Sequence, residues 1–275
     1  MKLVRKILIF IIIIIIAYLY NRNQIKNFKV IDLKLSSKKI VNTMRITQIS
    51  DFHSNDRINL QKLGDEIQQF NPHFIVLTGD TIDRNDDNLH TSIQLIETLN
   101  SLNTPIYFIM GNHEWDNILY EDLKTEMLSR NVIVLEDNSS TIEIDGNMVN
   151  IIGLRDSPEI ELDFNYQVIT NNLNLDYYNL LLIHSPNSVA KLVRASEDLI
   201  LSGHTHGGQI RFPLLGPIIA PGQGFFPELD KGLYEINNST LYIDSGLGNS
   251  FMTIRLLNPV QFTNITINSL SNSIQ

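Results

Sequence analysis

The sequence has no cysteine, which excludes both disulfide bonds and thiolate metal sites. Basic residues are fewer than acidic ones, and the formal net charge is −9. A general nucleic-acid binder needs a basic surface that displaces phosphate counterions, so no nucleic-acid polymer is expected as a partner. The sequence also lacks internal repeats. Its 275 residues, 43% hydrophobic and 19% charged, suit a globular chain with one substantial core or two small ones.

One long hydrophobic run is present, at the amino terminus. It extends from Ile7 to Tyr20, includes an unbroken isoleucine stretch from Ile11 to Ile16, and follows a basic cluster between Lys2 and Lys6. As a helix the run is about 21 Å long, shorter than the roughly 30 Å hydrocarbon core of a bilayer. Its length therefore suits either a membrane anchor or a signal peptide.

Two features favour an uncleaved anchor over a removed signal. No pair of small residues follows the run to form a cleavage site, and Tyr18 and Tyr20 suit an interfacial aromatic belt. A soluble core helix is disfavoured because the run has no polar face. We therefore predict a membrane anchor over residues 1–22 and a globular domain over 23–270. The leading basic cluster favours the cytoplasmic side, which would place that domain outside the cytoplasm at the cell membrane.

Apolar periodicity predicts strands alternating with helices in the first half and mainly strands in the second. Strands are expected over 31–35, 44–49, 74–78, 106–110, 132–135, 141–144, 149–152, 180–183, 199–201, 233–236, 241–244 and 261–267. Helices are expected over 60–70, 89–99 and 118–129. The Pro- and Gly-rich segment from Phe212 to Pro227 is predicted to be loop. The simplest architecture is an α/β fold of two packed mixed β-sheets flanked by helices.

Short polar blocks follow several of the predicted strands. They contain all of the seven histidines except His73 and His90, and they read Asp51-Phe52-His53, Gly79-Asp80, Gly111-Asn112-His113-Glu114, His184 and Gly203-His204-Thr205-His206. Ligand-binding groups collect at the carboxyl ends of strands in open sheets. A lone block of this kind is weak evidence, but the ordered set indicates one site that holds a pair of divalent metals.

These blocks, in this order, resemble the calcineurin-like metallophosphoesterases. The family pattern D-x-H, G-D, G-N-H-[DE], H and G-H-x-H is present in full between Met44 and His206. The resemblance implies a four-layer αββα sandwich and metal-dependent hydrolysis of a phosphate-ester substrate.

By motif position, the resemblance implies one metal ion held by Asp51, His53, Asp80 and His206. The second ion would be held by Asp80, Asn112, His184 and His204, so that Asp80 bridges the two. Imidazole ligands favour zinc, iron or manganese, and we expect two such divalent ions per chain. A shared carboxylate fixes ions of this kind about 3.5–4 Å apart.

The resemblance also assigns the chemistry. Water on such a metal is acidic enough to supply hydroxide near neutral pH, and hydroxide would attack phosphorus in line. His113 is not a ligand in the family: it contacts the phosphate or protonates the leaving oxygen, and Asp83 orients it. The expected catalytic residues are thus His113 and Asp83, and the expected substrate-binding residues are Asn112 and His113.

The downstream sequence resembles a bacterial branch of the family whose members carry an amino-terminal membrane segment or signal. The resemblance rests on the stretch from Gly203 to Arg211 and on the later Gly232-Leu233-Tyr234 and Gly246-Leu247-Gly248. The chain departs from that branch at Arg155, where Asp or another small polar residue is expected, and at Asp244-Ser245, which replaces Ser-Arg. Both departures concern substrate preference and leave the ligands unchanged.

Several other residues have a plainer reading. His73 and His90 are expected to be surface or structural, and Glu114 either caps a helix or serves the site. Arg211 and Arg255 could grip a phosphate by bidentate contacts, but structural ion pairs are the favoured role. The downstream glycines are expected to form tight turns.

The leading functional prediction is a membrane-anchored, dinuclear phosphoesterase that acts on a phosphodiester or pyrophosphate of a lipid-linked or envelope substrate. The alternatives are a broad-specificity phosphomonoesterase, a nucleotide phosphodiesterase, and a non-catalytic scaffold, which is disfavoured because no ligand is lost. The sequence gives no oligomeric state.

Overall fold

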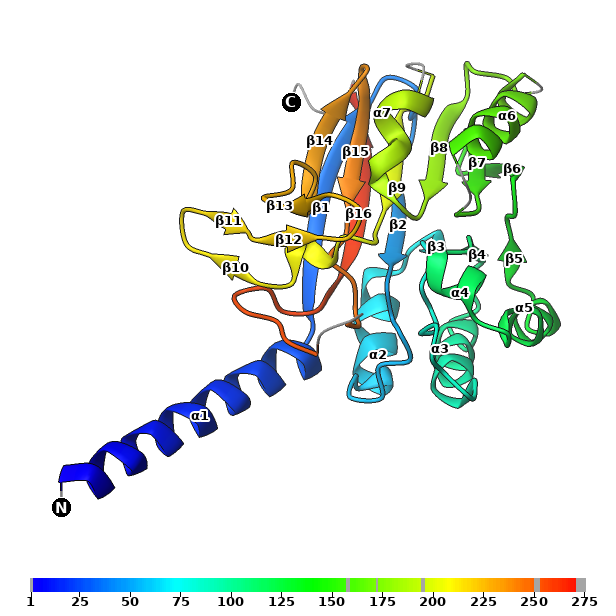
Figure 1. The fold of residues 1–275 in the computed structure, drawn as a ribbon. Coiled ribbons are helices and arrows are strands. Elements are labelled where there is room, and N and C mark those ends of the chain that lie inside the picture. Colours follow the sequence, from blue (N-terminus) through cyan, green and yellow to red (C-terminus); the bar gives the residue numbers. More distant parts are fainter. Residues whose placement is uncertain (1, 157–158, 172, 194–195, 250–252, 271–275) are drawn as a thin grey trace.

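The computed structural model describes residues 2–156, 159–171, 173–193, 196–249 and 253–270. Two six-stranded sheets pack face to face, and helices cover the outer face of each (Figure 1). Residues from both sheets meet in the central apolar layer, among them Ile46, Val76, Leu180 and Leu201. The expected four-layer αββα fold is therefore confirmed.

The first sheet has the strand order β1-β16-β2-β3-β4-β5. Strands β16 and β2 are antiparallel neighbours, and the other pairs are parallel. The bounds are β1 Lys29–Ser37, β2 Met44–Ile49, β3 Phe74–Leu77, β4 Ile106–Phe108, β5 Ile133–Val134 and β16 Gln261–Ser269. The parallel strands β3 and β4 are buried on both faces, which explains their wholly apolar sequences.

The second sheet has the order β14-β15-β9-β8-β7-β6 and is parallel in its centre. Each edge is an antiparallel hairpin whose turn residues have positive φ, Asp145-Gly146 at one edge and Asn237-Asn238 at the other. The bounds are β6 Asn138–Ile144, β7 Asn147–Leu154, β8 Tyr178–Ile183, β9 Leu199–Ser202, β14 Gly232–Ile236 and β15 Ser239–Ile243.

Helices cover the outer faces because their apolar stripes bury there. Leu63 and Ile67 of α2, for example, pack on the first sheet, and Leu192 of α7 packs on the second. The first sheet carries α2 Leu60–Phe70, α3 His90–Asn100 and α5 Tyr120–Ser129. The second carries α6 Glu159–Thr170 and α7 Val189–Leu192. Short turns lie in the connections: α4 Asn112–Asp116, η1 Pro186–Ser188 and η2 His206–Gly208.

Two expectations for the second half need correction. The helix α6 was not anticipated, because its apolar residues do not form a clear stripe. The segment from Phe212 to Pro227 is not all loop, since it contains two short antiparallel ribbons. Their strands are β10 Arg211–Phe212, β11 Gly216–Pro217, β12 Ile219–Ala220 and β13 Gly224–Phe225. Two-residue strands fall below the length at which periodicity can be read.

The amino-terminal helix α1, Lys2–Lys26, extends beyond the apolar run at both ends. It is apolar and long enough to cross a membrane, and the apolar part projects away from the sandwich (Figure 1). Its last turn is fixed to the globular part: Gln24 and Ile25 are buried, and the Gln24 carbonyl accepts a 2.9 Å hydrogen bond from Val260. The helix thus leaves the sandwich in one defined direction.

Candidate metal centre

The polar blocks meet at one edge of the sandwich, where strands of both sheets end. Asp51 follows β2, Asp80 follows β3, and Asn112 follows β4; His184 and His204 follow β8 and β9 of the second sheet. Non-glycine residues with positive φ gather here, namely Asp51, His53, Asp80, His204 and His206. A left-handed non-glycine residue costs about 1–3 kcal/mol, and such residues cluster at functional sites.

The carboxylate of Asp80 occupies the centre of the cluster and is buried. One oxygen, Oδ1, accepts a 2.9 Å hydrogen bond from the backbone N–H of His113. The other, Oδ2, lies 3.1 Å from His184 Nε2 and 3.6 Å from His53 Nε2. Burial alone would raise the pKa of Asp80, but His184 and His53 hold it well below its usual value. A single ionised oxygen therefore faces imidazoles from two sides.

Asp51 is held by donors from both sheets. Its Oδ2 accepts a 2.5 Å hydrogen bond from Ser50, and both oxygens lie 3.0 Å from the backbone N–H of His204. Burial raises the pKa of Asp51 to about 6, and nearby Asp80 adds repulsion. Oδ1 points to His206, whose Nε2 is 3.6 Å away. The Ser50 hydroxyl and the His204 backbone N–H thus fix the orientation of this carboxylate.

His53 and His206 face each other across this half of the site. Their Nε2 atoms are 3.3 Å apart, and both rings are buried. Burial lowers the pKa of His53 to about 3 and that of His206 well below its usual value, with His53 and Arg255 adding repulsion at His206. Burial therefore favours the neutral form of both rings, which is the form that binds a metal ion.

His184 and His204 form the other half. The Nδ1 of His184 lies 2.8 Å from the carbonyl of Thr78, so its N–H donates there and Nε2 is directed into the site. That Nε2 is 3.2 Å from His204 Nδ1. The buried Oδ1 of Asn112 has no hydrogen-bond partner within the described part of the chain. A buried amide oxygen without a partner is available to bind a metal ion.

His113 lies beside this cluster and is paired with Asp83. The Nδ1 of His113 is 3.2 Å from Asp83 Oδ2, and its Nε2 is 3.9 Å from Asp80 Oδ2. Burial works against protonation of His113, but the Asp83 contact prevails and raises its pKa. Asp83 is partly exposed, and the His113 contact lowers its own pKa. The backbone N–H of Arg84 also points to His113 Nδ1, at 3.1 Å. The Asp83 contact favours protonation of this ring, and Arg84 opposes it.

Glu114 connects two loops of the site through hydrogen bonds to their backbone. Of its two expected roles, capping a helix or serving the site, it therefore has the second. Its buried carboxylate accepts backbone N–H groups of Asp80 at 2.8 Å, Thr81 at 2.5 Å, Ile82 at 3.2 Å and Gly111 at 2.9 Å. It therefore ties the loop after β3 to the loop after β4. The sequence signal was its place three residues after Gly111, the spacing of a capping box.

Gly111 is required by close approach. A Cβ on Gly111 would lie 2.3 Å from Asp80 Oδ1 and 2.6 Å from the Asp80 nitrogen. No side-chain rotation relieves a contact with backbone, so any larger residue displaces the central carboxylate.

The donor set fits two metal ions. Within the described residues, ligand atoms converge in three groups: Asp51 with His53 and His206, Asp80 with His184 and His204, and His53 with Asp83 and His113. The first group holds three of the four residues expected for one ion, without Asp80, and the second holds three of the four expected for the other, without Asn112. Every metal and substrate residue predicted from the sequence is brought to this edge.

The remaining candidates have structural roles. Arg255 is buried, and its guanidinium donates to the carbonyls of Ser245 at 2.6 Å and Gly248 at 2.7 Å. Arg211 is paired with Asp230. His73 Nδ1 accepts from the backbone of Arg45, and His90 begins α3. Arg255 also lies against the site, with Nη2 3.4 Å from His206 Nδ1.

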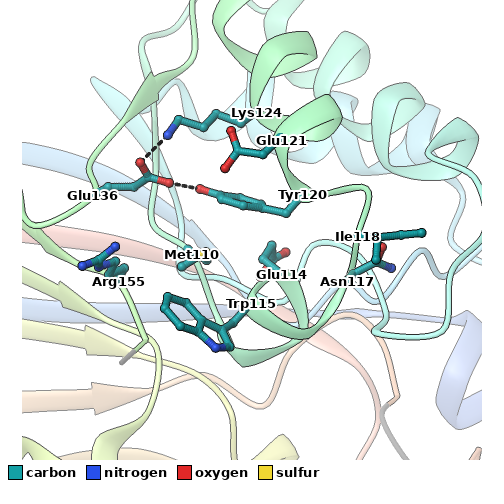
Figure 2. Close-up of a pocket in the computed structure, with 10 residues that line it drawn as sticks. All are labelled: Met110, Glu114, Trp115, Asn117, Ile118, Tyr120, Glu121, Lys124, Glu136 and Arg155. Atoms are coloured by element: carbon teal, nitrogen blue, oxygen red, sulfur yellow. Dashed lines mark hydrogen bonds and ion pairs between the residues drawn. The ribbon is translucent and has the colours of Figure 1, made fainter. Parts of the chain in front are cut away.

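A pocket of about 490 Å³ lies next to the loop that carries Asn112 and His113 (Figure 2). Its wall combines apolar and charged groups: Met110, Glu114, Trp115, Asn117, Ile118, Tyr120, Glu121, Lys124, Glu136 and Arg155. Lys124 and Tyr120 both contact Glu136, and the Arg155 guanidinium lies 5.9 Å from the centre of the Trp115 ring. The unusual Arg155 thus lines a space beside the reaction site.

A two-sheet sandwich with histidines and carboxylates converging at its carboxyl edge defines a class of metal-dependent hydrolases. The family model for calcineurin-like phosphoesterases matches residues 44–208, and the chain belongs to this family. It is therefore a metal-dependent hydrolase of phosphoesters, with a fold that binds two metal ions.

Proteins with similar sequences are also described as metallophosphoesterases. An uncharacterised metallophosphoesterase of Bacillus subtilis, YkuE, is 32% identical over 82% of this chain and 79% of its own length. A zebrafish (Danio rerio) transmembrane protein with a metallophosphoesterase domain is 25% identical over 87% of this chain and 57% of its own length. Among solved structures, TT1561 of Thermus thermophilus shares the fold, with a TM-score of 0.52 and 12% identity over 75% of this chain and 91% of that one.

Removing metal is expected to destabilise the protein, because the convergent carboxylates and strained loops then lack their cation. At a metal concentration about 100 times Kd, binding contributes about 2.7 kcal/mol. For a domain of this size that corresponds to a rise in Tm of about 5–10 °C. Calorimetry with EDTA and then with added Mn²⁺ measures the shift. An unchanged Tm would contradict the assignment of the site.

Gly111→Ala is expected to lower bound metal about 10–100-fold, because the new methyl group displaces Asp80. Elemental analysis of protein purified without chelator gives the metal content. Gly64→Ala is the matched control: Gly64 lies in α2, and its Cβ would meet only the Thr98 methyl group at 3.2 Å. Equal metal content in the two variants would refute the steric argument.

Proposed function

We propose that this phosphoesterase holds one metal ion with Asp51, His53, Asp80 and His206 and a second with Asp80, Asn112, His184 and His204. The observation that carries the proposal is the position of Asp80 Oδ2, 3.1 Å from His184 and 3.6 Å from His53. That single oxygen is shared by both halves of the site. Manganese, zinc and iron suit the mixture of imidazole and oxygen donors.

Two divalent cations bound there would supply Lewis acidity towards the phosphoryl oxygens and lower the pKa of coordinated water. The chain's own residues do the rest. Asn112 and His113 lie at the same edge and would bind the phosphate. His113, with Asp83 next to its Nδ1, would donate an Nε2 proton to the leaving oxygen. Asp83 acts through His113 and is therefore a positioning residue.

The proposal also includes the membrane. The helix α1 is apolar and suitable in length, and the zebrafish relative is described as a transmembrane protein. We infer that residues 1–22 anchor the domain of residues 23–270 to the cell membrane on the extracytoplasmic side. A tethered site favours a phosphodiester or pyrophosphate of a lipid-linked or envelope substrate over a soluble nucleotide or a general phosphomonoester.

Asp80→Asn is expected to lower hydrolysis of bis-p-nitrophenyl phosphate with Mn²⁺ by at least about tenfold, since a neutral amide no longer balances two cations. Asp87→Asn is the matched control, because Asp87 is an exposed carboxylate near the same loop. Activity of Asp80→Asn within tenfold of the wild type would remove the proposed mechanism. A parallel panel of phosphomonoesters and nucleotides discriminates the alternative substrates.

Asp83→Asn is expected to lower kcat and to move the alkaline limb of the pH–rate profile to lower pH. The Asp83 contact raises the pKa of His113, and the protonated form is lost as pH rises through that pKa. Removing the carboxylate therefore brings this loss to lower pH. Asp116→Asn serves as control, since Asp116 is an exposed carboxylate paired with Arg84. A lower kcat with an unshifted limb would mean that Asp83 is only structural.

A further inference from the structure

The segment from Phe212 to Pro227 exposes more apolar surface than a soluble domain tolerates without a partner. It contains no charged residue, and Gln223 is its only residue with a polar side chain. Leu214 is fully exposed, and Leu215, Phe225 and Phe226 are 68%, 73% and 66% exposed. Contiguous apolar patches of this kind mark contacts with proteins or membranes.

This segment forms the two ribbons β10–β11 and β12–β13, which project on the same side of the sandwich as α1 (Figure 1). The ribbons are tied to the loop that receives the helix. The backbone N–H of Arg211 donates to Leu256, and that of Leu256 donates to Gln209. In this loop Ile254 and Leu257 are about half exposed. The ribbons and the loop form one surface, which we call the apolar apron.

The apron also lies next to α1. A groove of about 500 Å³ separates the helix from the apron and is lined by Ile13, Ile16, Ala17, Tyr20, Asn21, Ile210, Ile254, Arg255 and Leu256. Ile13 lies seven residues before Tyr20, which is about 10 Å along a helix axis. The loop contacts the carboxyl-terminal end of this stretch: the Leu257 N–H lies 3.2 Å from the Tyr20 hydroxyl. If Tyr20 lies at the membrane surface, this part of the apron lies at the same level, and the groove extends from there towards Ile13.

We propose that the apolar apron is a membrane-docking surface that inserts into the bilayer beside α1. The proposal rests on the anchor assigned above and extends it. Lipid acyl chains would fill the groove and cover Leu214, Leu215, Phe225 and Phe226. A bilayer is the favoured occupant because the apron is continuous with an apolar helix through the groove. The exposed Arg22, Lys26 and Lys29 follow the apolar run and would meet anionic headgroups.

The apron also reaches the metal centre. Gly222 lies in the turn between β12 and β13, and a Cβ built there would be 4.0 Å from His204 Nε2. The Asn187 side chain donates to the carbonyl of Pro221 in the same turn, at 3.4 Å. The turn at Gly222 thus lies beside His204, while exposed side chains of the same ribbon, such as Phe225, are apolar. The substrate class that fits is a lipid whose phosphoester lies in the headgroup region of the same membrane.

The absence of cysteine makes the test direct, because each introduced cysteine carries the only label. Leu214→Cys and Phe225→Cys, labelled with nitrobenzoxadiazole, are placed in full-length protein in phosphatidylcholine–phosphatidylglycerol vesicles. Phe164→Cys on α6 is the matched control, since Phe164 is 67% exposed on the outer helical layer. Ile13→Cys reports on the anchor itself.

Labels on the apron are expected to have blue-shifted emission and to be quenched by doxyl-labelled lipid. Aqueous iodide is expected to quench them at least about threefold less than it quenches the label at position 164. Equal iodide quenching at the two surfaces would overturn the proposal. Protection from iodide without quenching by doxyl lipid would overturn it too, because a second copy of the chain would then cover the apron. If iodide quenches a label at position 13, α1 does not lie in the bilayer, and the proposed anchor is wrong as well. Hydrolysis of the chromogenic diester by the same preparations tests the enzymatic proposal separately.

Discussion

The candidate site is arranged around one buried carboxylate, Asp80, at the point where the two sheets meet. Burial opposes its charge, so the surrounding donors and imidazoles must overcome that cost. Glu114 fixes the loop on which Asp80 sits, and Gly111 leaves the space that its oxygen needs. The outer layers hold these loops in place. A sandwich of two sheets suits the task because each sheet contributes ligands from its own strand ends.

The cost of this arrangement is visible in the backbone. Ligand residues from three separate blocks adopt left-handed conformations that side chains normally avoid, and several histidines are buried within contact of one another. Both features oppose folding at this site, and metal ions held there would offset that cost. Arg255 shows how the fold restrains it: a buried guanidinium draws the 245–249 loop together through its backbone carbonyls and lies against His206.

The helix α1 has a defined position relative to the sandwich that carries the candidate site. The last turn of α1 is hydrogen-bonded to the loop that leads into β16, so the helix and the sandwich are not independently oriented. One part of the apolar apron, the loop with Ile254 and Leu256, shares a groove with that helix. Another part, the turn at Gly222, approaches His204. The apron therefore adjoins both the apolar helix and the candidate metal site.

The ligand blocks, the alternation of strands and helices, and the apolar amino terminus were readable from the sequence, because each depends on local residue type and spacing. The sequence did not predict the short strands, the weakly amphipathic α6 or the full length of α1. Local periodicity is too weak in these segments, or packing overrides it. Glu114 and Arg255 show the same limit: a charged side chain reads as solvated until its burial is known. The sequence determined which polar blocks follow the strands and the order in which they come. Only the tertiary structure decided that Asp80 faces both imidazole groups and that the apron borders α1, because both depend on contacts between segments far apart in the chain.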